Sequence, residues 1–295
     1  MMDQKNILYI NSIRSNFNGY TRICSLAKEL SVYNKCNITI DFSGCNWFDA
    51  NMCATFGALL YKAKRNLNNI KLININDGIR TIFCKNNFLS SYGFWPVEDT
   101  YSTTIKYQRF DPSAVRVFST YLDMNFKKEL MPDMSDPLRH KFFQSLEEIF
   151  QNSVMHADSR LGIFTCGQHF PRKNKLSFTI TDLGVGFDQS INKKYKKNFT
   201  SIEAIDWALQ GTNTAKYGLI PGGLGLKLLR EFISYNQGGF QIVSRSGFYS
   251  LAEDGKQYLY QCVDEFPGSI VNIDINTADE KSYLSSTTLS PEEVF

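Results

Sequence analysis

The sequence has no apolar run approaching the ~20 residues that a membrane-spanning helix needs. Its first residues, MMDQKNILYI, also lack the basic start and the long apolar core of a secretory signal. Seven cysteines are present, but none forms a CxxC pair, so a zinc cluster is not expected. Reduced and mostly buried thiols in a cytoplasmic protein are therefore the simplest expectation.

A strong charge imbalance is also missing. The 32 Lys and Arg residues are nearly matched by 29 Asp and Glu residues, which leaves a formal net charge of +3. Nucleic-acid binding and membrane-surface binding both need a concentrated basic field, and the composition gives neither any support. The chain has 295 residues, 43% of them hydrophobic, so its length and composition predict two domains with two buried cores.

Strand-like and helix-like segments alternate through the first part of the chain. Runs rich in β-branched residues indicate the strands, and apolar residues at helical spacing indicate the helices. In chain order we predict a strand over 7–10, a helix over 20–33, a strand over 37–42, a helix over 51–66, a strand over 70–75, a helical turn over 79–84 and a strand over 102–110. This alternation favours a mixed sheet with helices packed on it.

Two helices are predicted to follow. Asp111-Pro112 is a helix start signal, with Asp as the N-cap and Pro at the first helical position, and Ser135 begins a longer helix that runs to about Ala157. The remainder is rich in β-structure, with one more long helix. The later segments are strands over 161–166 and 175–181, a helix over 224–235, and strands over 239–244, 257–263 and 269–275. We place the domains at 1–110 and 111–278, followed by a polar tail, 279–295.

The long helix carries a polar stripe formed by Glu148, Asn152 and His156, each one turn from the next. A carboxylate and a carboxamide at this spacing suit a water-activating base beside an oxygen ligand for Mg²⁺. Such a stripe alone is also typical of an ordinary solvated helix face.

Two glycine motifs follow. Asp182-Leu-Gly184-Val-Gly186 comes directly after a predicted strand, where a carboxylate can accept a hydrogen bond from an exocyclic amine and glycines let backbone approach a ligand. On its own, this motif commonly marks a tight turn. Further on, glycines 218, 222, 223 and 225 lead into the last helix, whose N-terminus offers free N–H groups and a positive dipole end to phosphate. A Rossmann-type turn fits less well, because no strand precedes these glycines.

In this order and spacing, the three motifs resemble the N, G1 and G2 boxes of the GHKL superfamily of ATPases, over about residues 115–275. The resemblance implies an α/β sandwich, with helices on one face of a mixed sheet and Mg-ATP bound between the sheet and a lid. It makes Glu148 the catalytic base, Asn152 the Mg²⁺ ligand and Asp182 the carboxylate that reads adenine.

The same resemblance assigns the glycines and the lid. Gly184 and Gly186 would line the adenine pocket, and the phosphate-binding turn would be formed by Gly222, Gly223 and Gly225. The lid is expected at 187–221, where a basic and polar segment would close over the triphosphate. Within it, Thr214 and Lys216 are the predicted phosphate contacts, although a solvated loop explains its individual lysines equally well.

Residues 37–51, NITIDFSGCNWFDAN, with the helix and strand after them, resemble a STAS domain over about residues 1–100. In the sigma-regulating members of that family the loop ends in Asp-Ser, and a GHKL-type kinase phosphorylates the serine. Here Asp49 is followed by Ala50, which has no hydroxyl to phosphorylate. The alternative is a generic α/β domain that packs against the second half.

These resemblances favour an ATP-binding regulatory protein, a slow ATPase whose nucleotide state controls a protein partner; a homodimer is left open. The alternatives are an anti-sigma-type serine/threonine kinase acting on a separate STAS protein and a non-catalytic interaction module. A sensor histidine kinase fits poorly, because none of His140, His156 and His169 lies in a dimerisation domain ahead of the ATPase core. A gyrase- or MutL-type enzyme would need a further domain after the last strand.

Overall fold

The computed structural model describes residues 6–155, 159–211 and 224–279. These residues form a three-stranded parallel sheet and a five-stranded antiparallel sheet, with helices packed on both. The predicted mixed α/β class is therefore confirmed. One core lies between the two sheets and contains side chains of both, and the other lies on the opposite face of the second sheet. In this part of the chain, no helix combines the length and the apolar character needed to cross a membrane.

The first sheet has the order β1-β2-β3, with β1 at Asn6–Tyr9, β2 at Asn37–Asp41 and β3 at Asn69–Ile73. All pairs are parallel, so this sheet is not mixed as predicted. The physical reason is the connection: a helix follows each of the first two strands and returns the chain to the same end of the sheet. These crossover helices are α1 (Phe17–Ser31) and α2 (Cys53–Arg65).

Local signals fix the helix ends in this region. The Asn16 side chain accepts a hydrogen bond from Gly19 N at 3.0 Å and caps α1. After β3, Asn76 caps α3 (Asp77–Lys85) in the same way, accepting from Ile79 N at 3.0 Å. The helix α2 has no such cap, but it is buried over most of its length, as expected for a helix that is apolar nearly all round.

The second sheet has the order β4-β5-β6-β8-β7. Its strands are β4 (Thr104–Phe110), β5 (Ile163–Phe170), β6 (Lys175–Asp182), β7 (Gly239–Leu251) and β8 (Gln257–Asn276). Because β4 pairs with β5, the sheet begins before residue 111, and the boundary predicted at 110 would cut a strand from its own sheet.

A second correction concerns β8, which joins the two strands predicted at 257–263 and 269–275 into one. In the sequence, Pro267 and Gly268 separate these two predicted strands. In the structure they lie where the register with β7 shifts near Ser244 and Arg245, and a bulge tolerates proline inside a strand.

The second half contains five helices among its described residues: α4 (Val115–Asn125), α5 (Asp136–Met155), α6 (Gly186–Tyr195), α7 (Ser201–Leu209) and α8 (Leu224–Tyr235). The predicted helices at α5 and α8 are confirmed. The helix α4 begins later than expected, because the Asp111 carboxylate accepts from Ser113 N at 3.1 Å and forms a turn instead of a cap.

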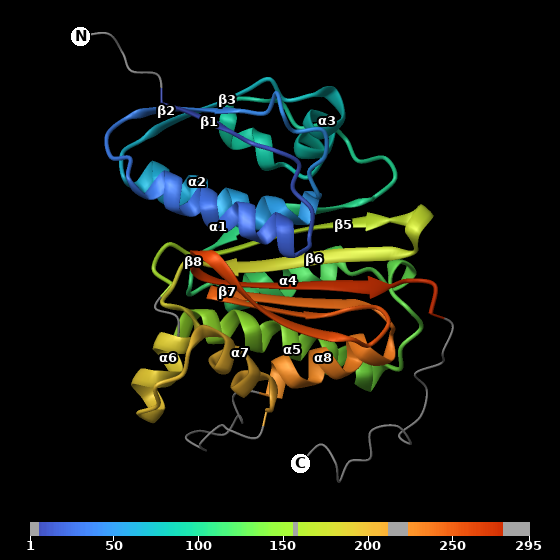
Figure 1. Cartoon of the computed structure of the whole chain (residues 1–295). Helices are drawn as coiled ribbons and strands as arrows, with labels where there is room; N and C mark the ends of the chain where they lie inside the picture. The colour runs from blue at the N-terminus through green and yellow to red at the C-terminus, as the bar shows by residue number, and fades with distance from the viewer. Residues whose placement is uncertain (1–5, 156–158, 212–223, 280–295) are drawn as a thin grey trace, which may run out of the picture.

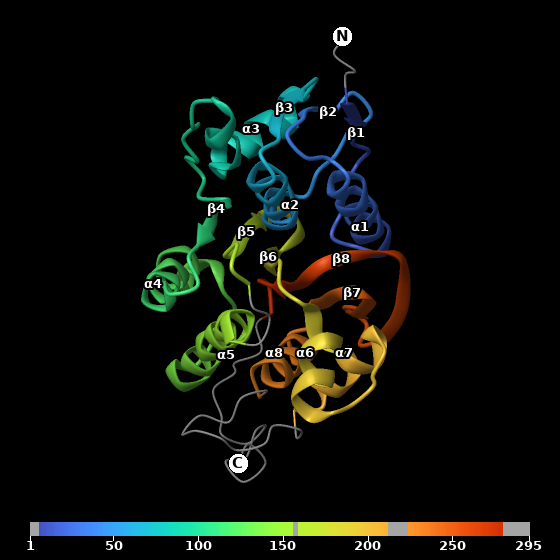
Figure 2. The same ribbon diagram turned by 90° about the vertical axis from the view of Figure 1, so that its left-hand side faces the viewer.

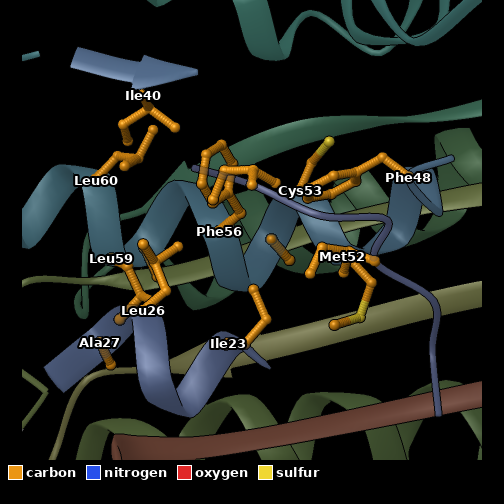
Figure 3. Packing of buried hydrophobic residues seen from close by; sticks show 14 of the residues in the cluster. Ile23, Leu26, Ala27, Ile40, Phe48, Met52, Cys53, Phe56, Leu59 and Leu60 are labelled. Atoms are coloured by element: carbon orange, nitrogen blue, oxygen red, sulfur yellow. The ribbon is translucent and has the colours of Figure 1, made fainter. Parts of the chain in front are cut away.

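The elements stack in layers (Figure 1). Helices α1 and α2 lie between the two sheets, while α5 and α8 lie side by side on the opposite face of the second sheet, next to α6 and α7 (Figure 2). In the middle layer, Leu26 of α1 packs towards Leu59 of α2, and Leu60 points towards Ile40 of β2 (Figure 3). The second sheet is thus covered on both faces. Its own helices cover one face, and the N-terminal unit, from β1 to α3 (6–85), covers the other.

All seven cysteines are free thiols, and six of them are buried, which confirms the prediction of mostly buried thiols. They contribute to packing in the way that small apolar side chains do.

Candidate functional site

Asp182 is the last residue of β6, and only 3% of its surface is exposed. One carboxylate oxygen accepts from Gly184 N at 2.8 Å, and the other accepts from the Ser153 hydroxyl at 3.3 Å. Burial disfavours the ionised form and raises the pKa of Asp182 from 3.8 to about 6. Gly184, Ser153 and Ser269 favour the ionised form through hydrogen bonds and oppose the effect of burial.

The bond from Ser153 connects β6 to α5, the helix that carries the predicted polar stripe. Asn152 directly precedes Ser153, and Glu148 lies one turn earlier on the same helix face. Both Glu148 and Asn152 are half-buried. The first and second motifs are therefore neighbours in space, through a contact between Asp182 and Ser153, a serine outside the polar stripe.

Glu148 in turn lies against the first turn of α8. A Cβ added at Gly225 would stand 2.9 Å from Oε2 and 3.0 Å from Cδ of Glu148. Only a glycine leaves this space for the carboxylate without displacing it. The N–H groups of a first helical turn have no partners within the helix, and this end of a helix favours negative charge. Glu148 and Gly225, predicted for different roles in one site, are thus in contact.

The two glycines after Asp182 have different settings. Gly184 donates its N–H to Asp182, as described above. Gly186 begins α6 with a φ of +81°, and a Cβ there would stand 2.6 Å from Cγ of Arg245. Glycine is required at Gly186 by this approach of β7, a packing reason that the motif alone does not reveal.

Four predicted site residues lie outside the described residues, namely Thr214, Lys216, Gly222 and Gly223, as does His156 of the polar stripe. Of the predicted phosphate-binding turn, the structure therefore places Gly225.

The described part of the expected lid, 187–211, contains α6 and α7, joined by a non-helical connection over 196–200. The helix α7 begins with a capping box, in which the Thr200 hydroxyl accepts from Glu203 N at 3.3 Å and Thr200 N donates to Glu203 at 2.8 Å. Lys193 and Lys194 fall in the last turn of α6, where cations complement the negative end of a helix.

The loop that resembles the STAS phosphorylation loop is buried against the second sheet. Ala50 and Asn51 have no exposed surface. The Asn51 amide donates to Thr179 Oγ1 at 3.0 Å and to Asn272 Oδ1 at 2.8 Å. The loop is thus a fixed contact with β6 and β8.

This contact was missed in the sequence, although a signal was present. Ser177, Thr179 and Thr181 alternate along β6, and such a row of small polar residues marks one face of a strand. Thr181 shares a hydrogen bond of 3.1 Å with Thr55 of α2, so the row continues the polar contact to the N-terminal unit.

No family model matches the chain, and a search of curated proteins found no match. The function is therefore inferred from the geometry of α5, β6 and α8 together with the three motifs.

Proposed function

We propose that the chain binds ATP with Mg²⁺ in a GHKL-type pocket and is a slow ATPase whose nucleotide state controls a protein partner. The observation that carries this proposal is the convergence of three motifs that are distant in sequence. Asp182 is bonded to Ser153, which neighbours Asn152. Glu148 of the same helix lies on Gly225.

Asp182 has the properties of an adenine-reading residue. Its carboxylate is held from two sides, so it would accept from an exocyclic amine with little rearrangement. The raised pKa shows that the fold bears the cost of burying an ionisable group at the end of this strand. A carboxylate perturbed in this way is a recognised indication of a functional site, and a donor from the ligand would offset that cost.

Glu148 would orient the attacking water and accept its proton. Its carboxylate is positioned by the contact with Gly225 at the start of α8. Asn152 would supply one oxygen ligand to Mg²⁺, whose charge would be balanced by the phosphates. A single protein ligand is in keeping with Mg²⁺, which usually binds proteins through one or two side chains together with substrate phosphates. The described residues contain no group of three His, Cys, Asp or Glu arranged to hold a metal, and this chemistry does not require one.

The alternative acceptor for the γ-phosphate is a hydroxyl of a separate STAS protein. Ala50, at the acceptor position of the chain's own STAS-like loop, has no hydroxyl and is fully buried, which argues against transfer to that position. A kinase would therefore act on another molecule.

Labelled ATP distinguishes these functions. The purified chain is incubated with γ-labelled ATP and Mg²⁺, alone and with a cell lysate, and label is followed into inorganic phosphate and into protein. Phosphate released by the chain alone supports the ATPase, whereas label in a second protein supports the kinase. If neither is observed, and millimolar Mg-ATP does not change the melting temperature, the result would support a non-catalytic interaction module. The Glu148→Gln variant controls for a contaminating enzyme.

A further inference from the structure

A cavity of 380 Å³ lies on the other face of the second sheet, where the C-terminal ends of α1 and α2 meet β8. Its floor is apolar and is formed by the buried side chains of Leu30, Leu59 and Phe266. Small-molecule sites typically measure about 300–1,000 Å³, are mostly apolar with a few polar groups, and favour domain interfaces. The volume and the position of this cavity meet these conditions, and its apolar floor is surrounded by polar and charged residues.

The charged groups around the cavity are paired, with one exception. Lys28 Nζ lies 2.7 Å from Asp264, whose other oxygen accepts from Ser25 at 2.8 Å. The Arg245 guanidinium lies 2.6 Å from Glu265. The carboxylates of Asp264 and Glu265, which line the cavity, are therefore both paired with cations.

Lys62 is the exception. Across the described ranges, its ammonium takes part in no ion pair. The side chain is half-buried in the wall of the cavity, and burial lowers the pKa of Lys62, since a charged group loses hydration there. An anion bound in the cavity would restore the interaction that Lys62 has lost with water.

We propose that this cavity binds a small amphipathic carboxylic acid. Its carboxylate would pair with Lys62, and its apolar body would cover Leu30, Leu59 and Phe266. One unpaired cation matches a singly charged carboxylate better than a doubly charged phosphate group. The apolar floor likewise selects a hydrocarbon over a sugar.

Arg245 connects this cavity to the turn after Asp182. The residue has a left-handed backbone, with φ of +52°, and its side chain lines the cavity while Cγ lies close to Gly186. Its Nε is 3.8 Å from the Asp188 carboxylate of α6. Within the described part of the chain, Arg245 Nε and Asp188 Oδ1 are buried without a hydrogen bond.

A bound acid that shifts Arg245 would therefore act on the first turn of α6. Two ligands are coupled when one changes the population of the state that the other prefers. If the proposed function is correct, the acid would be an effector of the nucleotide site, and this step alone rests on that function.

The test uses octanoate and the full chain without nucleotide, with binding followed by calorimetry. The variants are Lys62→Met and, as the matched control on the same helix, Lys64→Met. Lys64 is also partly buried, but its ammonium lies over the Tyr92 ring at 3.9 Å, away from the cavity. We expect wild type and Lys64→Met to bind octanoate alike, and Lys62→Met to bind it about tenfold more weakly or worse.

Two further measurements complete the test. Octanol, which lacks the charge, should bind wild type more weakly than octanoate does, and Lys62→Arg should retain octanoate binding. Equal affinity of wild type and Lys62→Met for octanoate, or no saturable binding to wild type, would overturn the proposal. Melting curves of the variants show that they are folded.

The connection to α6 has a readout that does not need ATP. Phe187 N donates to Ser244 Oγ at 2.8 Å, so hydrogen exchange of this amide reports on the turn. Octanoate should change its exchange rate in wild type and not in Lys62→Met. If the chain binds octanoate but not ATP, the proposal for the cavity is supported and the proposed function is refuted.

Discussion

Along β6, the central strand of the second sheet, the two faces have opposite chemistry, whereas β5 and β7 also place apolar side chains such as Phe164 and Val243 in the core shared with the first sheet. On β6, Leu176, Phe178 and Ile180 face α5 and α8 and belong to an apolar core, and Asp182 ends this row. The intervening residues, Ser177, Thr179 and Thr181, form the opposite, polar face towards the N-terminal unit. On β8, Ile273 lies on the apolar face and Asn272 on the polar one, while Ile270, on the same side as Asn272, packs in the first core.

This difference separates two tasks. An apolar face holds helices through burial, which is not directional, and so leaves a strand end free to carry a reactive group. A polar face that is buried must match its partner bond by bond, because each unpaired group costs free energy. A satisfied polar network therefore specifies which unit docks and in what position. The following predictions test whether the two faces work independently.

The largest effect is expected from Glu148→Gln in α5, one of the helices that cover the apolar face. The amide keeps the size of the side chain but cannot accept a proton, and general-base catalysis contributes typically about 10²–10⁴-fold in rate. The turnover number for ATP should fall by that factor, while the Kd for ATP changes little. Glu147→Gln, next to it on another face of α5, is the control. Near-normal turnover in Glu148→Gln would remove Glu148 from the chemistry.

Asp182→Asn should change how the stability of the nucleotide-free protein depends on pH. The folded pKa of about 6 exceeds the unfolded value of 3.8, so the folded state binds the proton more tightly. The stabilisation from this carboxyl is complete below pH 3.8 and is lost as the pH rises through about 6. The wild type should therefore lose up to about 3 kcal/mol relative to Asp182→Asn between pH 4 and pH 7.

Urea unfolding of both proteins across this range measures that difference. The lost acceptor for the Ser153 hydroxyl is the same at every pH and shifts only the offset between the two curves. Parallel curves for the two proteins would show that Asp182 is not destabilised by burial.

The same variant should weaken ATP binding while it stabilises the empty protein. Loss of a buried, charged hydrogen bond costs about 1.5–3 kcal/mol, or roughly 10- to 150-fold in Kd. For the wild type, the affinity should also fall as the pH drops below about 6, where the carboxyl of Asp182 becomes protonated. Calorimetric titrations with ATP and with GTP, which lacks the adenine amine, test this. Equal ATP affinity of the wild type and Asp182→Asn would show that Asp182 has a role in the turn and none in ATP binding.

Asn51→Ala addresses the polar face. It removes the donor to Thr179 and Asn272 in a site without solvent, which should lower the free energy of unfolding by about 1–3 kcal/mol. The Kd for ATP should not change, because the amide lies on the face away from Asp182. A double-mutant cycle with Thr179→Ala isolates the pair. A tenfold change in ATP affinity would show that the faces are coupled and would contradict the comparison.

The sequence predicted the regular elements where local signals were strong. The β-branched run of β2 and the start of α5 at Asp136 were identified nearly to the residue. The helix α7 was missed even though Thr200 and Glu203 have the spacing of a capping box, because a lysine-rich segment precedes them. The capping-box signal was present, but the lysine-rich composition of the segment favoured the interpretation as a loop.

Contacts between distant segments could not be predicted from the sequence. Nothing near Gly186 indicates that Arg245 lies over it, and nothing near Asn51 names Thr179 as its partner. The motifs supplied the residues of the proposed site, but the contact through Ser153 that joins two of the motifs depends on how α5 packs on β6.

Gly225→Ala should have the smallest effect on stability and still discriminate between two roles of this glycine. Alanine favours a helix over glycine by about 1 kcal/mol, which would stabilise α8. The new Cβ would meet the Glu148 carboxylate at 2.9 Å, which can rotate away, and Cβ of Glu148 at 3.0 Å, which requires a small separation of α5 and α8 that offsets the gain in helix propensity. Stability should therefore change by no more than about 1 kcal/mol.

Turnover should respond differently, because the rotated carboxylate no longer lies where the fold positions it, and small misplacements of a catalytic group cost up to about 10²-fold. In the Glu148→Gln background, Gly225→Ala should add little further loss, since the group that it displaces has already lost its function. Melting curves and turnover numbers of the single and double variants measure both effects. Full additivity of the two rate losses would show that Gly225 acts on the phosphate-binding turn itself, and not through Glu148.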